Sequence, residues 1–198
     1  MKKNNRSAVS AKTVSEYNVG GVIIHNSNEK CSKNIKKILE DYNKLNNRRS
    51  IIIADSLDLE NSLNICVCHL FFGKDYKRHG WFKGLILEKE FFNFMLKRKL
   101  LSDITDFFKD KLSVISSDIF KQVRKDLNDL ILIRNKVAHG SIFYDGDREA
   151  FYIEYYEGRK KEDKFDDSFM RSFKDKYTFL DKHLRKLNEY IRENDIIK

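Results

Sequence analysis

The stretch Ile131-Leu-Ile-Arg-Asn-Lys-Val-Ala-His-Gly140 decides the fold of this chain. It closes an apolar segment whose spacing of three or four residues is typical of an amphipathic helix: Ile119, Val123, Leu127 and Leu130. Ser117 or Asp118 is suited to cap the start of this helix, and Gly140 is suited to stop it. Because Arg134 stands where the next apolar residue is due, we expect it to point inward or into an interface.

The spacing of the polar residues in this stretch defines a candidate site. Each helical residue turns by about 100°, so Asn135 and His139 are expected to stack one turn apart, with Arg134 to one side. The small Ala138 lies between them and leaves room for a ligand. An amide and an imidazole four residues apart can also form a hydrogen bond that orients the ring.

These side chains suit chemistry on a phosphodiester. An arginine fork stays charged and donates two hydrogen bonds to a phosphate at once, and histidine transfers protons near neutral pH. Arg134, Asn135 and His139 are therefore candidate catalytic residues. The alternative is structural, since a lone arginine and a lone histidine near a helix end often serve as an ion-pair partner and a carboxyl-terminal cap.

The pattern R-N-x-x-x-H formed by Arg134, Asn135 and His139 resembles the motif of the HEPN family. The resemblance covers the motif closely and residues 55 to 191 loosely. It implies a small helical domain that dimerises and cleaves RNA without a metal, with His139 as the acid–base residue and Arg134 as the phosphate clamp. A two-fold dimer would join two motifs in one composite site.

The resemblance also implies a biological setting. Members of the family serve in prokaryotic defence, as toxins or as abortive-infection and antiviral effectors, so an antitoxin or a defence-system partner is expected. Some of these toxins carry a tyrosine two positions after the histidine. Here Ser141 stands at that position and the nearest downstream tyrosine is Tyr144, so regulation through that tyrosine is not expected.

Apolar periodicity predicts the rest of the fold as an all-α bundle of four to five helices with a β-hairpin inserted before the last helix. The expected helices cover residues 32–46, 56–72, 87–100, from about 117 to 139, and 167–193, with a break at 46–50 and a link at 74–84. The hairpin pairs residues 141–144 with 150–156, and 158–163 reads as a charged loop. The last helix has an apolar seam with 4-3-4-3-4 spacing, which suits packing inside the bundle or across a dimer: Phe173, Tyr177, Leu180, Leu184, Leu187 and Ile191.

Charge divides the chain unevenly. Of the formal net charge of +9, residues 1–50 contribute +7 from eleven basic and four acidic residues. We therefore expect a basic amino-terminal extension with one helix over residues 1–50 and a HEPN-like helical domain over 51–198. Clustered basic charge attracts nucleic acid, although such extensions are as often solvated tails.

Further residues are candidates for supporting roles. Lys136, Arg78, His79 and Trp81 are candidate substrate-binding residues, the last three as a clamp on single-stranded RNA. Glu60 could hold Arg134 in place across the bundle, or face solvent. The run Lys97-Arg98-Lys99 reads as a solvated helix end.

Composition excludes several classes of protein. No apolar run is long enough to cross a membrane, the basic start is not followed by a signal sequence, and the odd set of three cysteines indicates a reducing cytoplasm. Cys66 and Cys68 diverge on a helix, so they are expected in the core and not at a metal. No metal and no cofactor is expected. Two alternatives to the enzyme stay open, namely a non-catalytic HEPN-like module that binds RNA or a nucleotide, and a dimerisation domain.

Overall fold

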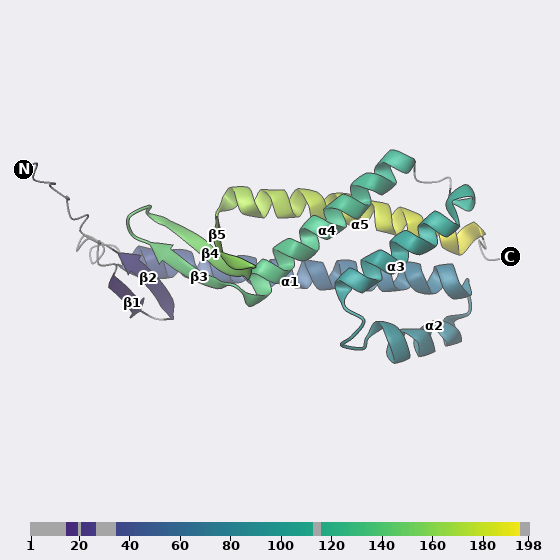
Figure 1. Ribbon diagram of the computed structural model, residues 1–198, viewed down its shortest axis with the longest axis horizontal. Coiled ribbons are helices and arrows are strands. Elements are labelled where there is room, and N and C mark those ends of the chain that lie inside the picture. Colours follow the sequence, from purple (N-terminus) through teal and green to yellow (C-terminus); the bar gives the residue numbers. More distant parts are fainter. Residues whose placement is uncertain (1–14, 20, 27–34, 113–115, 195–198) are drawn as a thin grey trace, which may run out of the picture.

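The computed structural model describes residues 15–19, 21–26, 35–112 and 116–194, and it is mostly helical with a small sheet at one end (Figure 1). The main helices are α1 (Ile35–Phe72), α2 (Tyr76–Phe82), α3 (Phe94–Phe107), α4 (Ser117–His139) and α5 (Asp167–Asn194), with short turns η2 (Lys83–Leu87) and η3 (Lys109–Lys111). The strands are β1 (Ser15–Val19), β2 (Val22–Asn26), β3 (Ser141–Asp145), β4 (Ala150–Glu157) and β5 (Arg159–Lys164). The expectation of a mostly helical fold is therefore confirmed, but the fold is not purely α, because a five-stranded sheet stands where a single hairpin was expected.

One long helix, α1, replaces the two helices expected over residues 32–46 and 56–72. The run Asn46-Asn47-Arg48-Arg49-Ser50 contains no proline or glycine, so it weakens a helix without ending it. Buried residues continue through it at intervals of seven, at Ile38, Leu45, Ile52 and Leu59. The division expected between residues 1–50 and 51–198 thus falls inside α1 and not at a linker.

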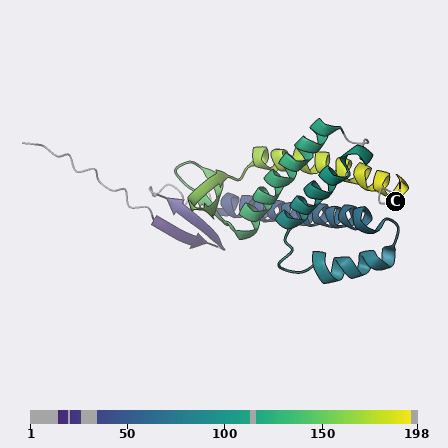
Figure 2. The same ribbon diagram turned by 45° about the vertical axis from the view of Figure 1, so that its right-hand side comes forward.

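The bundle is built on α1, against which α3, α4 and α5 pack (Figures 1 and 2). The seam of α5 lies inside this bundle, because Phe173, Leu180, Leu184, Leu187 and Ile191 are all at most 1% exposed. Of the two settings that the seam allowed, the interior of the bundle is confirmed. A dimer of this chain would have to use another surface.

The sheet has the strand order β1-β2-β3-β4-β5. The hairpin of β3 and β4 is confirmed, with Ser141 opposite Glu154 and Asp145 opposite Ala150. Before the bundle in sequence, β1 and β2 form an antiparallel hairpin, and β2 pairs parallel with β3. The charged loop expected at 158–163 is wrong: all of these residues but Gly158 belong to the edge strand β5, which pairs antiparallel with β4.

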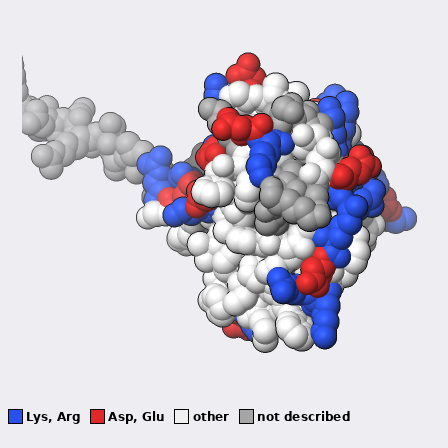
Figure 3. Space-filling model, turned by 90° about the vertical axis from the view of Figure 1, so that its right-hand side faces the viewer, with Lys and Arg blue, Asp and Glu red and all other residues white. Residues whose placement is uncertain are grey.

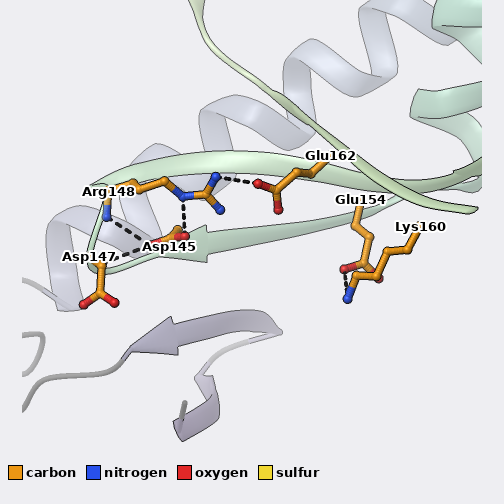
Figure 4. A network of polar contacts seen from close by, with 6 residues as sticks. All are labelled: Asp145, Asp147, Arg148, Glu154, Lys160 and Glu162. Carbon is orange, nitrogen blue, oxygen red and sulfur yellow. Dashed lines mark hydrogen bonds and ion pairs between the residues drawn. The ribbon is translucent and has the colours of Figure 1, made fainter. Parts of the chain in front are cut away.

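Ion pairs explain how a strand without apolar residues is held. Lys160 pairs with Glu154 on β4, and Arg148 in the β3–β4 turn bridges Asp145 and Glu162 (Figure 4). Asp145 also accepts hydrogen bonds from the backbone of Asp147 and Arg148, at 3.0 and 2.9 Å. Cross-strand pairs of opposite charge stabilise a sheet, and charges on an edge strand discourage further pairing.

The segment between α1 and α3 also differs from expectation. The link at 74–84 contains the helix α2, whose start is capped by Asp75 accepting from the Arg78 amide. The helix expected from residue 87 begins only at Phe94, because Asn93 caps it by accepting from the Leu96 amide at 3.1 Å. None of the helices in the described ranges combines the length and apolarity needed to cross a bilayer.

Candidate active site

The helix α4 carries the motif as expected and ends at His139. Its start is capped by Ser116, one residue before the expected cap, through a bond from the Ile119 amide. Its end is fixed by Gly140, which is buried with extended backbone angles (φ −81°, ψ 158°). A Cβ at Gly140 would lie 2.4 Å from the Lys136 carbonyl oxygen and 2.7 Å from that of Glu154. The glycine is therefore required by close packing on β4 and not by a left-handed conformation.

Arg134 and Asn135 line a cavity of about 520 Å³ between α1, α4 and the segment that leads into α3. Arg134 is half-buried, in keeping with its place on the apolar stripe, and its Nη1 donates to Asn135 Oδ1 at 3.1 Å. Among the described residues, no carboxylate forms an ion pair with Arg134. Its positive charge is therefore uncompensated at the edge of an open cavity.

A buried ion pair lies in the same cavity. The Lys97 ammonium on α3 is 4% exposed and donates to Glu60 Oε1 on α1. Glu60 therefore lines the cavity with Arg134, but it neutralises Lys97 and not Arg134 as expected. The expectation that Lys97 lies on a solvated helix end is wrong, because Lys97 follows the buried Phe94 by one turn and precedes the buried Leu101.

An unpaired polar group lies beside this ion pair. Asn64 on α1 lines the cavity, its side chain is 3% exposed, and its Oδ1 has no hydrogen bond within the described part of the chain. Buried polar atoms are nearly always paired, because an unpaired one has lost its water without a replacement. Asn64 is thus an acceptor without a donor.

His139 lies outside the lining of this cavity and is exposed at the last position of α4. By helical geometry it stands about 6 Å along the axis from Asn135, on nearly the same side. The expected hydrogen bond between these two side chains is absent: within the described ranges the imidazole has no hydrogen bond, and Asn135 Oδ1 accepts from Arg134. The ring is exposed to solvent.

A residue that the sequence did not suggest holds the end of α4. Arg49 on α1 donates from Nη2 to the Ala138 carbonyl oxygen at 2.9 Å. A positive charge at a helix carboxyl terminus is favourable because the last carbonyls lack partners and carry partial negative charge. Arg49 therefore fixes the turn that presents His139.

Lys136 points to the sheet side of α4. Its ammonium lies 2.7 Å from Asp163 Oδ2 on β5 and 4.4 Å from the centre of the Tyr155 ring. Burial acts to lower the pKa of Lys136, but hydrogen bonds to Asp163 and Tyr155 outweigh it and the pKa is raised. Because its charge is already compensated, Lys136 has no role in the site we propose.

Arg78, His79 and Trp81 lie on α2 and do not line the cavity of Arg134. His79 donates to the Gly73 carbonyl oxygen at 2.9 Å, and Arg78 pairs with Asp75 at 3.2 Å. Trp81 is 62% exposed, with the Lys77 ammonium 5.4 Å from its ring centre. On the face seen in Figure 3, charged side chains of both signs alternate around uncharged surface. Because Arg78, His79 and Trp81 do not line the cavity of Arg134, they are not joined to the motif on α4.

The two cysteines of α1 are confirmed as core residues. Cys66 is fully buried and Cys68 is 3% exposed, and neither forms a disulfide. Burial raises the pKa of the Cys66 thiol to about 12, so it stays protonated. Within the described ranges, no three metal-ligating side chains gather in one place.

Two residues of the cavity that the sequence analysis did not select, Lys97 and Asn64, are polar residues at apolar positions of a helix, as Arg134 is. Lys97 stands at a core position of α3, whose buried residues include Phe94, Leu101 and Ile104. Asn64 stands at a core position of α1, between Leu63 and Cys66. Polar residues at apolar positions of two helices therefore indicate the cavity.

Comparison with protein-family models, with curated proteins and with solved structures finds no match for this chain.

Proposed function

We propose that this protein is a metal-independent endoribonuclease, as its resemblance to the HEPN family implies. One observation supports this most strongly. Arg134 is half-buried at the edge of a cavity of about 520 Å³ and has no carboxylate partner among the described residues. A desolvated cation without a counterion is costly unless an anion binds there. A phosphate of a nucleic-acid strand meets that need through two hydrogen bonds from the guanidinium.

The reaction is a transesterification within RNA. The ribose 2′-hydroxyl attacks the adjacent phosphorus, its proton passes to a base, the bond from phosphorus to the 5′-oxygen breaks, and that oxygen receives a proton. The products are a 2′,3′-cyclic phosphate and a 5′-hydroxyl. Arg134 stabilises the added negative charge on the phosphate, and His139 transfers a proton, for which an exposed imidazole is suited.

One chain supplies one histidine, whereas the reaction needs a base and an acid. A second copy related by a two-fold axis would supply the other histidine and complete a composite site. The apolar seam of α5 is buried in the bundle, so the contact between copies would use other surfaces. Partly exposed apolar side chains are available on the helices of the site, at Leu57 on α1 and Leu132 on α4, which are 48% and 40% exposed.

The test is cleavage of mixed RNA in the presence of EDTA by the wild type and by His139→Ala. We expect cleavage by the wild type and none by the variant, because no other described histidine adjoins the motif. Since His139 is exposed and has no hydrogen bond to the part of the chain that the structure describes, the variant should keep the wild-type melting temperature. His183→Ala, which removes a half-buried histidine of α5, serves as the control and should cleave normally. Full activity of His139→Ala would refute the proposal.

The second candidate function is a non-catalytic module that binds RNA or a nucleotide. It is favoured by the lack of any described group that orients the His139 ring, since catalytic imidazoles usually depend on such a partner. This candidate predicts RNA binding that Arg134→Met abolishes, with no cleavage by any variant. A role as a toxin or defence effector with a partner protein belongs to the first candidate alone.

A further inference from the structure

We propose that the cavity beside Arg134 is a subsite for a guanine base of the RNA, next to the phosphate that is cleaved. The inference deepens the proposed function and rests on it for the position of the phosphate. It assigns roles to Glu60, Asn64 and Lys97, which lie deeper in the cavity than the proposed chemistry requires.

The cavity has the size and lining of a nucleotide site. Its volume of about 520 Å³ falls within the range of about 300–1,000 Å³ that small-molecule sites occupy. Its apolar lining includes Leu87 and Ile131, both at most 2% exposed, and the aromatic rings of Phe92 and Phe94. Flat apolar and aromatic surfaces accept the face of an unstacked base.

The polar groups in the cavity lack hydrogen-bond donors opposite them. Asn64 Oδ1 is buried and unpaired within the described residues. Glu60 uses Oε1 for Lys97, while Oε2 has no hydrogen bond within the same ranges. A ligand that fits both groups would donate a hydrogen bond to each, and the bond to Asn64 matters most because a buried acceptor without a donor costs free energy. The Lys97 ammonium, which has three donors, can also serve an acceptor on that ligand.

Guanine meets this requirement better than the other bases. Its Watson–Crick edge presents a ring N–H beside an exocyclic amine, which together match a carboxylate, and its O6 lies next to them as an acceptor. Glu60 would accept from the N–H and the amine, Lys97 would donate to O6, and Asn64 would accept the second amine hydrogen. Adenine and cytosine each offer a single donor group on this edge, and uracil offers one N–H between two carbonyls that the carboxylate would repel.

The charged side chains that line the cavity disfavour a phosphate deep inside it. Three acids line it, Glu60, Glu88 and Glu90, against the two lysines Lys89 and Lys97, and Lys97 is already neutralised by Glu60. Arg134, in contrast, has no ion-pair partner among the described residues. A nucleotide would therefore place its base among Asn64, Glu60 and Lys97 and its phosphate at Arg134, where His139 is one turn farther along α4.

The test is calorimetric titration of the His139→Ala protein with the 3′-monophosphates of guanosine, adenosine, cytidine and uridine. We expect the guanosine nucleotide to bind at least tenfold more tightly than the others. Asn64→Leu and Glu60→Gln should each remove this preference, while Arg134→Met should weaken all four nucleotides alike. Asn64→Leu replaces an unpaired amide with an apolar side chain of similar size, so it should fold even where Glu60→Gln does not. Lys99→Met, an exposed change on α3, is the control and should keep the preference.

Four equal affinities, or no binding at all, would overturn the guanine subsite. The two proposals fail separately when cleavage of mixed RNA by the wild type is mapped in parallel. Guanine selectivity without cleavage would keep the subsite and refute the nuclease. Cleavage without selectivity would keep the nuclease and refute the subsite. If both hold, every cut has a guanosine on the same side.

Discussion

Replacing Gly140 with alanine should destabilise the protein markedly. The new methyl carbon would lie 2.4 Å from the Lys136 carbonyl oxygen, 2.7 Å from the Glu154 carbonyl oxygen and 2.9 Å from Ile153 Cγ1. Two of these three contacts are with backbone atoms, one in α4 and one in β4, which cannot rotate away. Overpacking a tight site costs about 1–3 kcal/mol, and backbone contacts favour the upper end. At roughly 2–4 °C per kcal/mol for a chain of this size, the melting temperature should fall by about 6–12 °C.

The matched control is Gly80→Ala, whose added carbon would meet no atom within 4 Å. Gly80 lies within α2, where alanine favours the helix by about 0.5–1 kcal/mol, so this variant should melt at or slightly above the wild-type temperature. Thermal unfolding followed by circular dichroism measures both variants. A Gly140→Ala protein that melts within about 2 °C of the wild type would refute the reasoning, because β4 would then yield easily around the end of α4.

Two further predictions concern helix ends. Asp166 caps α5 by accepting from Ser168 Oγ and from the amides of Ser168 and Phe169, and the Ser168 hydroxyl above all lowers the pKa of Asp166 to about 2. Asp166→Ala should therefore lower the free energy of unfolding by about 1 kcal/mol at neutral pH, as lost caps do. Because the folded-state pKa is depressed, this difference in stability from the wild type should persist above pH 4 and vanish as the pH falls through 2. Chemical unfolding at several pH values measures it. Arg49→Met removes the bond to the Ala138 carbonyl oxygen, so it should cost about 1 kcal/mol and slow RNA cleavage without changing nucleotide affinity, whereas Lys36→Met, an exposed change on the same helix, should do neither.

The sequence predicted those elements whose pattern is local. α4 and α5 lie within one residue of their expected bounds because apolar residues recur regularly in them and polar caps precede them. The β3–β4 hairpin followed from aromatic runs on both sides of Asp145-Gly146-Asp147. In each case, neighbours along the chain determine the structure, so periodicity and turn residues sufficed.

The elements that failed depend on partners distant in sequence. Residues 46–50 stay helical because Leu45 and Ile52 pack into the common core on either side of them. β5 contains no apolar residue, and it forms because β4 offers a free edge and its Glu154 pairs with Lys160 of β5. Neither the core contact nor the free edge can be inferred from the segment itself, since tertiary contacts override local propensity.

The same distinction between local pattern and distant partners applies to the residues of the site. The place of Arg134 on the apolar stripe predicted that it points inward or into an interface, and its half-buried side chain agrees with the first, because that inference needs only the period of α4. The partner of Glu60 could not be inferred, since it depends on which residue of α3 faces α1. Periodicity applied to α3 would nevertheless have selected Lys97 as a buried base. A buried charge must find a counterion, and Glu60 was one acid for which a place facing the bundle had been considered, beside a solvent-facing one.

Three helices thus place polar groups at positions where an apolar residue would stabilise the bundle more. Asn64 on α1, Lys97 on α3 and Arg134 on α4 converge on one cavity. Of the two charged residues, only Lys97 has an ion-pair partner among the described residues. Burying such groups costs more free energy than their pairing returns, so packing alone gives no reason for them to meet. A ligand that donates to Asn64 and carries an anion to Arg134 removes both deficits at once. A nucleotide has both features in one molecule, which neither a free phosphate nor an apolar ligand provides.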